Sequence, residues 1–201
     1  MTQSPQPIFD TQIAHGVGGW FPVPNLSHGY HGLMRQWWEF YGLGKSALLV
    51  SESTVVREVF ENKYPGVRFV STDYFLELSD NQRPCDVIWN LYTDPPKVLS
   101  SMSFDSVICS ALLEHVLDPV GILRRLVNMM NPMAYLYLHT VSTQFGYHAY
   151  PRDYLRYFRD WFEDLRIVIP ALSLVELFYS KKRGHLLACY QIKNGNEEFV
   201  P

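Results

Sequence analysis

Apolar and polar positions alternate along this chain in blocks that predict strands and helices in turn. Short apolar runs predict strands, and segments with apolar residues three or four positions apart predict helices. The expected strands are 47–50, 67–70 (closing on Asp73), 85–91, 106–109 and 134–138, and the expected helices are 29–41, 54–64, 119–130 and 152–164. Such alternation is typical of a mostly parallel sheet with helices on both faces.

The first three of these helices each have a set of apolar positions that should face the core. These are Leu33, Trp37, Phe40 and Tyr41 in the first helix, Val55, Val56, Val59 and Phe60 in the second, and Leu123, Leu126, Val127 and Met130 in the third. Asp118 and Pro119 suit the N-cap and first position of the third helix. Asn131 and Pro132 are expected to end it.

The pattern changes near the C-terminus. Runs at 173–179 and 185–192 flank the polar stretch Lys-Lys-Arg-Gly, which predicts a hairpin and hence an antiparallel pair at the end of the sheet. Residues 1–28 are rich in Pro and Gly and predict loop rather than regular structure. We expect a single domain, with an N-terminal lid or helical segment at 1–43 and an α/β domain at 44–201.

Composition argues against several classes of protein without excluding nucleic-acid binding. The net charge of −3 gives no electrostatic case for nucleic acid, and no apolar run is long enough to span a bilayer. The N-terminus does not resemble a signal peptide. Three distant cysteines argue against a disulfide framework, and the seven histidines show no metal-ligand spacing. A cytoplasmic protein without a metal site is expected.

The most informative run is 104–119, Phe-Asp-Ser-Val-Ile-Cys-Ser-Ala-Leu-Leu-Glu-His-Val-Leu-Asp-Pro. It resembles the fourth-strand region of the small-molecule branch of class I S-adenosylmethionine (SAM) methyltransferases. The order of elements over residues 44–192 is similar to that family as well. The resemblance implies a Rossmann-like fold, in which a mostly parallel seven-stranded sheet ends in an antiparallel hairpin whose last strand lies beside the fifth.

The resemblance also implies a cofactor site at the carboxyl ends of the strands. The family usually has an acid in the first strand and a Gly-x-Gly-x-Gly loop after it. Here Leu49 replaces the acid, and Ser51, Ser53 and Val55 replace the glycines. Ser51, Glu52 and Ser53 could form a cofactor loop, or they could be a simple strand-to-helix turn in which serine caps the helix.

Other cofactor contacts follow from the same resemblance. Asp73 is expected to bind the ribose hydroxyls, since a carboxylate accepts well from two adjacent hydroxyls. Tyr92 is expected against the adenine, or alternatively in the core or at its rim. Ser110, Ala111 and His115 are expected at the methionine end of the cofactor. His115 could instead be a helix-start histidine satisfied by nearby backbone.

A second specific match lies at 147–154, Tyr-His-Ala-Tyr-Pro-Arg-Asp-Tyr, which resembles a His-x-Tyr-Pro-x-Asp-Tyr stretch of some small methyltransferases. His148 is the candidate catalytic base, because histidine titrates near neutrality. Tyr150 and Tyr154 could surround the sulfonium by cation–π contact. Alternatively, Pro151 and Asp153 start a helix, with Asp153 as its cap.

Two functions from different classes remain. The first is a SAM-dependent methyltransferase that acts on an oxygen or nitrogen of a small molecule. The second is a degenerate relative that has lost SAM binding and serves as a binding or structural subunit, as the replaced glycines suggest. Related folds also host other chemistry. Self-association and a protein partner are both left open.

Overall fold

The computed structural model of the protein describes residues 29–73, 85–148, 152–180 and 183–194. Its strands are β1 (Ser46–Val50), β2 (Arg68–Asp73), β3 (Val87–Ile88), β4 (Phe104–Ser110), β5 (Met130–Val141), β6 (Leu172–Tyr179) and β7 (His185–Ile192). Its helices are α1 (Gly29–Tyr41), α2 (Thr54–Lys63), α3 (Lys97–Ser100), α4 (Pro119–Val127) and α5 (Arg159–Val168), with the short 3₁₀ turn η1 (Leu113–His115).

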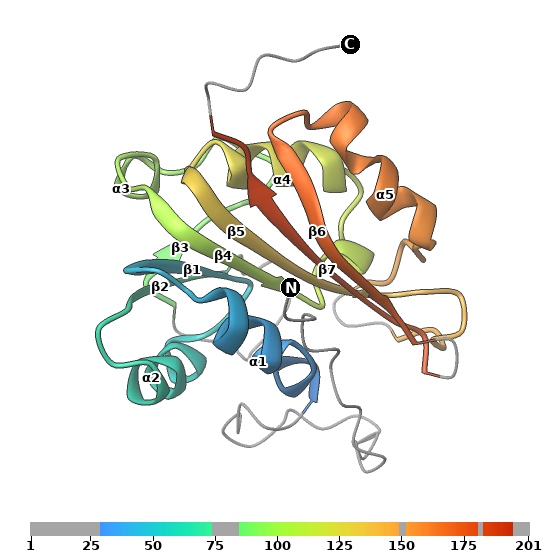
Figure 1. Ribbon diagram of the computed structural model, residues 1–201, viewed down its shortest axis with the longest axis horizontal. Coiled ribbons are helices and arrows are strands. Elements are labelled where there is room, and N and C mark those ends of the chain that lie inside the picture. Colours follow the sequence, from blue (N-terminus) through green and yellow to red (C-terminus); the bar gives the residue numbers. More distant parts are fainter. Residues whose placement is uncertain (1–28, 74–84, 149–151, 181–182, 195–201) are drawn as a thin grey trace.

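In this described part of the chain, the strands form one seven-stranded sheet with the order β3-β2-β1-β4-β5-β7-β6 (Figure 1). The first five strands pair in parallel. β7 is antiparallel to both β5 and β6, between which it lies. The expected fold class is therefore confirmed, including the terminal hairpin and the last strand beside the fifth.

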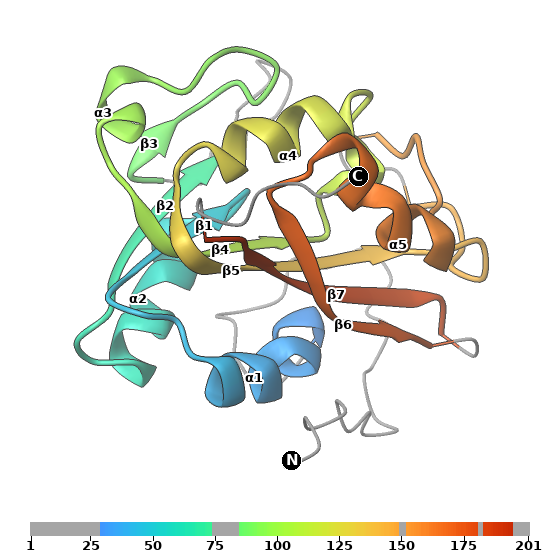
Figure 2. The ribbon, with the colours of Figure 1, turned by 45° about the horizontal axis from the view of Figure 1, so that its top comes forward.

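Helices cover both faces of the sheet, as Figure 2 shows: α1 and α2 lie on one side, and α4 and α5 on the other. Under α1 and α2 the core contains Trp37, Trp38, Phe60 and their apolar neighbours from the strands. The opposite core contains the inner faces of α4 and α5. Burial of these apolar surfaces is the main term that stabilises the layers. None of the described helices combines the length and apolarity needed to cross a membrane.

Several element boundaries differ from expectation. β3 has only two residues, whereas 85–91 was expected to be a strand. α4 ends at Val127, and Met130 starts β5 rather than continuing the helix to Asn131. The Asp118 cap is confirmed, because its Oδ1 accepts from Gly121 N at 2.9 Å and Pro119 is the first helical residue.

Two apolar positions expected in the core are exposed. Phe40 in α1 is 47% exposed and Val55 in α2 is 42% exposed. The expected positions Trp37, Val56 and Phe60 are buried, and Trp38, which was not expected to face the core, is buried with them. Residues three and four positions apart share a helix face, so Val56 and Phe60 lie on the buried face of α2 and Val55 lies outside it. The same burial makes Trp37 and Trp38 core residues rather than part of a lid over the site.

The strand register brings the carboxyl ends of four strands to one edge. Val50 pairs with Thr72 of β2 and with Cys109 of β4, and Cys109 pairs with Leu138 of β5. The residues that follow these positions therefore line the same edge of the sheet. In open α/β sheets this edge is where ligands bind.

Candidate functional site

Ser51 begins the loop after β1 with left-handed backbone, at φ 61°. Glycine adopts such a conformation at no steric cost, and here serine adopts it in place of the first glycine of the expected motif. Its Oγ donates to Asp73 Oδ1 at 3.3 Å, so the loop and the end of β2 are directly connected. The geometry that a glycine would supply is thus retained without the glycine.

The next two residues of the loop are buried. Glu52 N donates to Thr72 O at 3.1 Å, and Ser53 caps α2 by accepting from Val56 N at 3.4 Å. The serine capping considered as the alternative is therefore present. It coexists with the left-handed turn at Ser51, and the N-terminus of α2 points its free N–H groups toward this edge, a favourable place for a polar ligand.

Ser110 is the last residue of β4, and Ala111 follows it at the same edge. Ala111 also has left-handed backbone, at φ 50°, and its N–H donates to His139 O at 2.9 Å. Ser110 Oγ is buried and has no hydrogen-bond partner among the described residues. A buried hydroxyl without a partner costs free energy unless a ligand or water satisfies it. Together with the Ser51 turn, this hydroxyl fits a polar ligand such as the methionine end of SAM.

Tyr92 lies after β3 and is exposed. Its hydroxyl accepts from Leu117 N at 3.0 Å, which connects the end of β3 to the turn after η1. Tyr92 therefore lies at the border of the site, and its ring is exposed to solvent.

Glu114 is the most buried charged side chain at the site, with no exposed side-chain surface. Its Oε2 accepts from Thr140 Oγ1 of β5 at 2.6 Å, and its backbone carbonyl accepts from Tyr154 N at 2.8 Å. Burial raises the pKa of Glu114 above its ordinary value, although the Thr140 hydrogen bond opposes that shift. Oε1 has no hydrogen-bond partner among the described residues.

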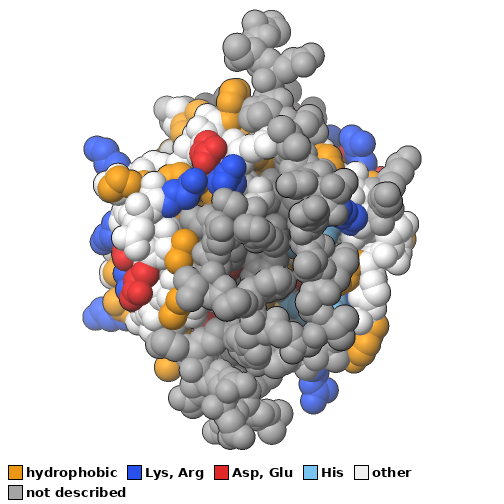
Figure 3. Space-filling view, turned by 90° about the horizontal axis from the view of Figure 1, so that it is seen from below, with side chains coloured by type: hydrophobic (Ala, Val, Ile, Leu, Met, Phe, Trp, Pro, Cys, Tyr) orange, Lys and Arg blue, Asp and Glu red, His pale blue; other side chains and the backbone are white. Residues whose placement is uncertain are grey.

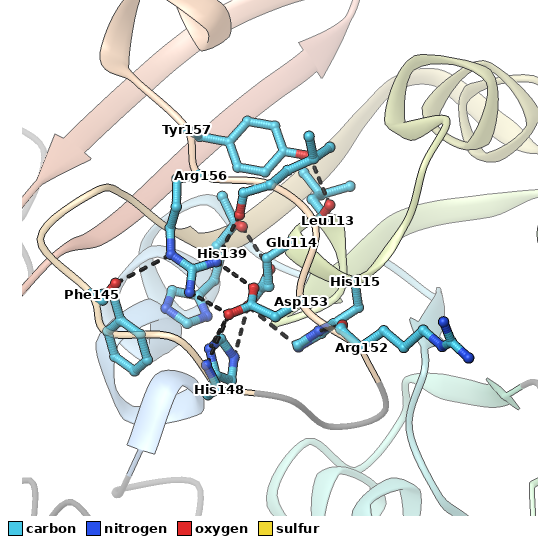
Figure 4. A network of polar contacts seen from close by, with 12 residues as sticks. Leu113, Glu114, His115, His139, Phe145, His148, Arg152, Asp153, Arg156 and Tyr157 are labelled. Carbon is cyan, nitrogen blue, oxygen red and sulfur yellow. Dashed lines mark hydrogen bonds and ion pairs between the residues drawn. The ribbon is translucent and has the colours of Figure 1, made fainter. Parts of the chain in front are cut away.

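His115 and His148 face this oxygen from two segments (Figure 4). Each Nε2 is 3.9 Å from Glu114 Oε1, and the two ring centroids are 4.9 Å apart. His115 Nδ1 contacts Arg152 O at 2.5 Å, so it must be the protonated nitrogen, because a carbonyl only accepts. Burial lowers the pKa of His115, which keeps the ring neutral with its Nε2 lone pair toward Glu114.

The loop that holds His148 is fixed by Asp153 and Arg156. The Asp153 carboxylate accepts from His148 N at 2.8 Å, lies 3.5 Å from His148 Nδ1, and binds the Arg156 guanidinium through both oxygens. Hydrogen bonding to Arg156 lowers the pKa of Asp153 to about 2, so the pair is fully ionised. Asp153 is not a helix cap as expected, because α5 begins only at Arg159.

The structure brings together most of the residues expected at the site. Ser51, Glu52, Ser53, Asp73, Ser110, Ala111, His115 and His148 lie at the carboxyl-end edge, with Tyr92 at its border. Tyr150 lies outside the described residues, and Tyr154 is exposed. In Figure 3, which views the molecule from below, histidine side chains reach the surface on one side of this face.

Sequence reasoning missed Glu114, Thr140 and Arg156 as parts of the site. Glu114 was noted only as part of the 104–119 run, whereas its neighbour His115 was expected at the site, and no role was predicted for Thr140. The Asp153-to-Arg156 spacing of three residues could have indicated an ion pair, but a helix cap was expected there instead.

Known proteins can be compared with this geometry. A family model described as a methyltransferase domain matches residues 26–182, well over half of the chain. None of the curated protein sequences matches significantly. The fold is similar to a SAM-dependent methyltransferase from Aquifex aeolicus, with 12% identity, TM-score 0.53, and 79% of this chain and 88% of that chain covered.

It is also similar to the plantazolicin methyltransferase BpumL solved with SAH, with 10% identity, TM-score 0.56, and coverages of 74% and 76%. A third similar structure is the CurJ carbon methyltransferase, with 13% identity, TM-score 0.58, and coverages of 81% and 52%. At these identities the structures support the fold, while the family match supports membership. The chain belongs to the methyltransferase-domain family.

Proposed function

We propose that this protein transfers a methyl group from SAM to an oxygen or nitrogen of a small-molecule acceptor. The observation that carries the proposal is the placement of two groups of residues at one sheet edge. The Ser51–Asp73 pair and the unpartnered Ser110 hydroxyl lie at the ends of β1, β2 and β4. The Glu114, His115 and His148 side chains lie beside them, at the ends of β4 and β5.

The first group is proposed to hold the cofactor. Asp73 is assigned to the ribose hydroxyls, and the Ser51–Glu52–Ser53 loop with Ser110 and Ala111 to the methionine end. Tyr92, whose hydroxyl is already tied to Leu117 N, is assigned to the adenine rim. Bound SAM supplies an electrophilic methyl carbon on a sulfonium, whose carbon–sulfur bond breaks with its electron pair staying on sulfur.

The second group is proposed to face the acceptor. Methyl transfer requires mainly that a nucleophile be held in line with the methyl carbon, and a protonated acceptor also needs a base. His148 is the proposed base, since its side chain is partly exposed and its Nε2 points into the cluster. Tyr150 and Tyr154 are proposed to surround the sulfonium, as their place in the loop beside His148 suggests.

Other properties of this proposal follow from the sequence. The net charge of −3 favours a small-molecule acceptor over a nucleic acid. Three free cysteines, two of them buried, are compatible with a reducing compartment, so we assign the protein to the cytoplasm.

Calorimetric titration with SAM and with S-adenosylhomocysteine tests the proposal directly. We expect micromolar binding of both ligands, at least a tenfold loss of affinity in Asp73→Ala, and no loss in Asp94→Ala, a matched exposed aspartate outside the site. His148→Ala should bind SAM as the natural chain does and transfer methyl more slowly. Absence of binding by either ligand would favour the degenerate relative without cofactor.

A further inference from the structure

Three electron-pair donors converge at the acceptor side of the site. Glu114 Oε1, an imidazole nitrogen of His115 and one of His148 all lie within 4.8 Å of one another. They come from η1 and from the loop after β5, segments separated by more than thirty residues of sequence (Figure 4). The spacing along the chain therefore gave no indication of this cluster.

Each imidazole is oriented by a second oxygen on its far side. His115 Nδ1 donates to the carbonyl of Arg152, and His148 Nδ1 faces Asp153 Oδ2 at 3.5 Å. The first contact places the proton of His115 on Nδ1 and leaves its Nε2 lone pair directed at Glu114, whereas His148 Nδ1 lies within ion-pair range of Asp153 without a hydrogen bond among the described residues. Metal-ligating histidines in proteins are usually held in this way, by a carbonyl or carboxylate behind the ring.

Glu114 completes the pattern. One carboxylate oxygen is satisfied by Thr140, and the other is directed at the two imidazoles without a donor among the described residues. The side chain is fully buried, so water does not compensate this oxygen at the surface. A buried carboxylate oxygen without a donor is unfavourable unless a proton or a cation lies beside it.

We propose that Glu114, His115 and His148 bind a divalent cation of the Zn²⁺ class. Two imidazoles and one carboxylate form a donor set that zinc uses in catalytic sites, which keep a further position open. Zinc bonds of about 2.0–2.2 Å in tetrahedral geometry place donor atoms about 3.3–3.5 Å apart. The observed 3.9 Å separations require each imidazole to move about half an ångström toward Glu114 Oε1, and the three donor atoms, which lie within 4.8 Å of one another, must all close to the zinc spacing.

The His148 side chain can supply that movement, because it is 35% exposed while its backbone N–H is held by Asp153. The position of Glu114 is fixed by contrast, since its side chain is bonded to Thr140 and its carbonyl to Tyr154 N. We therefore expect Glu114 to keep its position when a cation binds and His148 to move toward the cation.

The chemical role of this metal site rests on the proposed methyl transfer, and it makes that proposal more specific. A hydroxyl acceptor bound at the open position becomes more acidic, so its proton leaves to water and His148 serves as a ligand rather than as the base. The acceptor oxygen then forms the bond to the methyl carbon, with the electron pair of the broken carbon–sulfur bond staying on sulfur. The acceptor class narrows to oxygen nucleophiles that can coordinate a metal, such as vicinal diols, catechols or hydroxy acids.

Titration of the chelator-treated full chain with ZnCl₂ tests the site without any need for SAM. We expect one Zn²⁺ per chain at micromolar or tighter affinity, and visible absorption bands when Co²⁺ is added instead. His148→Ala and Glu114→Gln should each weaken binding at least tenfold, and Asp153→Asn, which lies behind His148, about tenfold. His185→Gln is the matched control, because His185 pairs with His139, is not one of the three donors, and its loss should leave Zn²⁺ binding as in the natural chain.

Circular dichroism of each variant separates lost folding from lost binding, and His148→Ala, at a partly exposed loop position, is the variant expected to fold normally. Absence of stoichiometric binding, or equal affinity in His148→Ala and the natural chain, would overturn the metal site. SAM titration of the same metal-free sample keeps the two proposals apart. SAM binding without Zn²⁺ binding refutes this inference alone, and Zn²⁺ binding without SAM binding refutes the proposed function alone.

Discussion

Arg156 donates to both oxygens of the Asp153 carboxylate from its two terminal guanidinium nitrogens. The same guanidinium donates to the carbonyls of Phe145 and Gly146, at 3.2 and 2.8 Å. A single side chain therefore connects the two ends of the loop that carries His148. Asp153 is almost fully buried, so the pair is a structural support of the site rather than a surface ion pair.

Replacing Arg156 with Met should destabilise the fold by about 3–5 kcal/mol, because it leaves a buried carboxylate without its partner. Urea unfolding monitored by circular dichroism measures the change. Arg159→Met is the control, since Arg159 forms an exposed pair with Glu163 and should change stability by less than about 1 kcal/mol. Similar losses in the two variants would contradict the supporting role of Arg156.

Ser51 offers a test of backbone strain in the loop after β1. At φ 61° a β-branched side chain is strongly disfavoured, so Ser51→Val should cost about 2 kcal/mol or more. Ser51→Gly should change stability by less than about 1 kcal/mol, because relief of strain offsets the lost hydrogen bond to Asp73 and the greater backbone entropy of glycine. Thermal unfolding of both variants measures the difference, and tolerance of valine would show that the left-handed turn is not required.

Tyr157 connects the segment before α5 to the turn that carries Glu114. Its buried hydroxyl donates to Leu113 O at 2.7 Å. Tyr157→Phe should therefore cost about 1–2 kcal/mol in urea unfolding, as expected when a buried acceptor loses its donor. Tyr147→Phe should be nearly neutral, because Tyr147 is highly exposed. Equal stability of Tyr157→Phe and the natural chain would mean that water replaces the lost donor.

Asp105 gives the fold a dependence on pH. Burial raises the pKa of Asp105, but hydrogen bonds from Asn131, Lys45 N and Ser46 N outweigh it and hold the pKa below its ordinary value. The ionised form therefore stabilises the fold at every pH above the unfolded-state pKa of about 3.9, and this stabilisation is lost as pH falls through the folded-state pKa.

Asp105→Asn should accordingly reduce stability by about 1–3 kcal/mol at pH 7, the usual range for hydrogen bonds to a charged group. The difference in free energy of unfolding between Asp105→Asn and the natural chain should shrink as pH falls below about 3.9, the ordinary pKa of an aspartate. Urea midpoints measured from pH 7 to pH 3, with the exposed Asp94→Asn as control, provide the measurement. A difference that stays constant with pH would contradict the role of the carboxylate charge.

The fold could be predicted from the sequence because alternating strand and helix patterns leave few arrangements open. The pattern could not place α5, since residues 152–158 have apolar spacing that suits a helix. Their N–H groups are used elsewhere: Tyr154 and Leu155 donate to Glu114 O, and Tyr157 donates to Val141 O. Such long-range partners override local propensity, and one sequence does not display them.

Site residues could be predicted where a motif within one segment indicates them. Contacts between two segments that are far apart in the sequence could not. His115 and His148 were each expected at the site, for separate reasons. Their convergence on Glu114 depends on the path of the loop after β5, which Arg156 fixes. Ser51 is a different case, because the sequence left open a cofactor loop or a simple strand-to-helix turn and did not predict that a serine would adopt the left-handed backbone of the missing glycine.

The position of β7 between β5 and β6 also bears on how the protein matures on the ribosome. When β6 emerges, its neighbour in the sheet has not yet been made, and β5 presents an unpaired edge until residues 185–192 follow. Ser142, at the start of the loop that carries His148, likewise has no acceptor for its backbone N–H until Gly184, whose carbonyl accepts from it, has been made. A nascent chain stalled before β7 is therefore expected to expose an adhesive strand edge and to need chaperone protection, until β7 emerges and pairs with both β5 and β6.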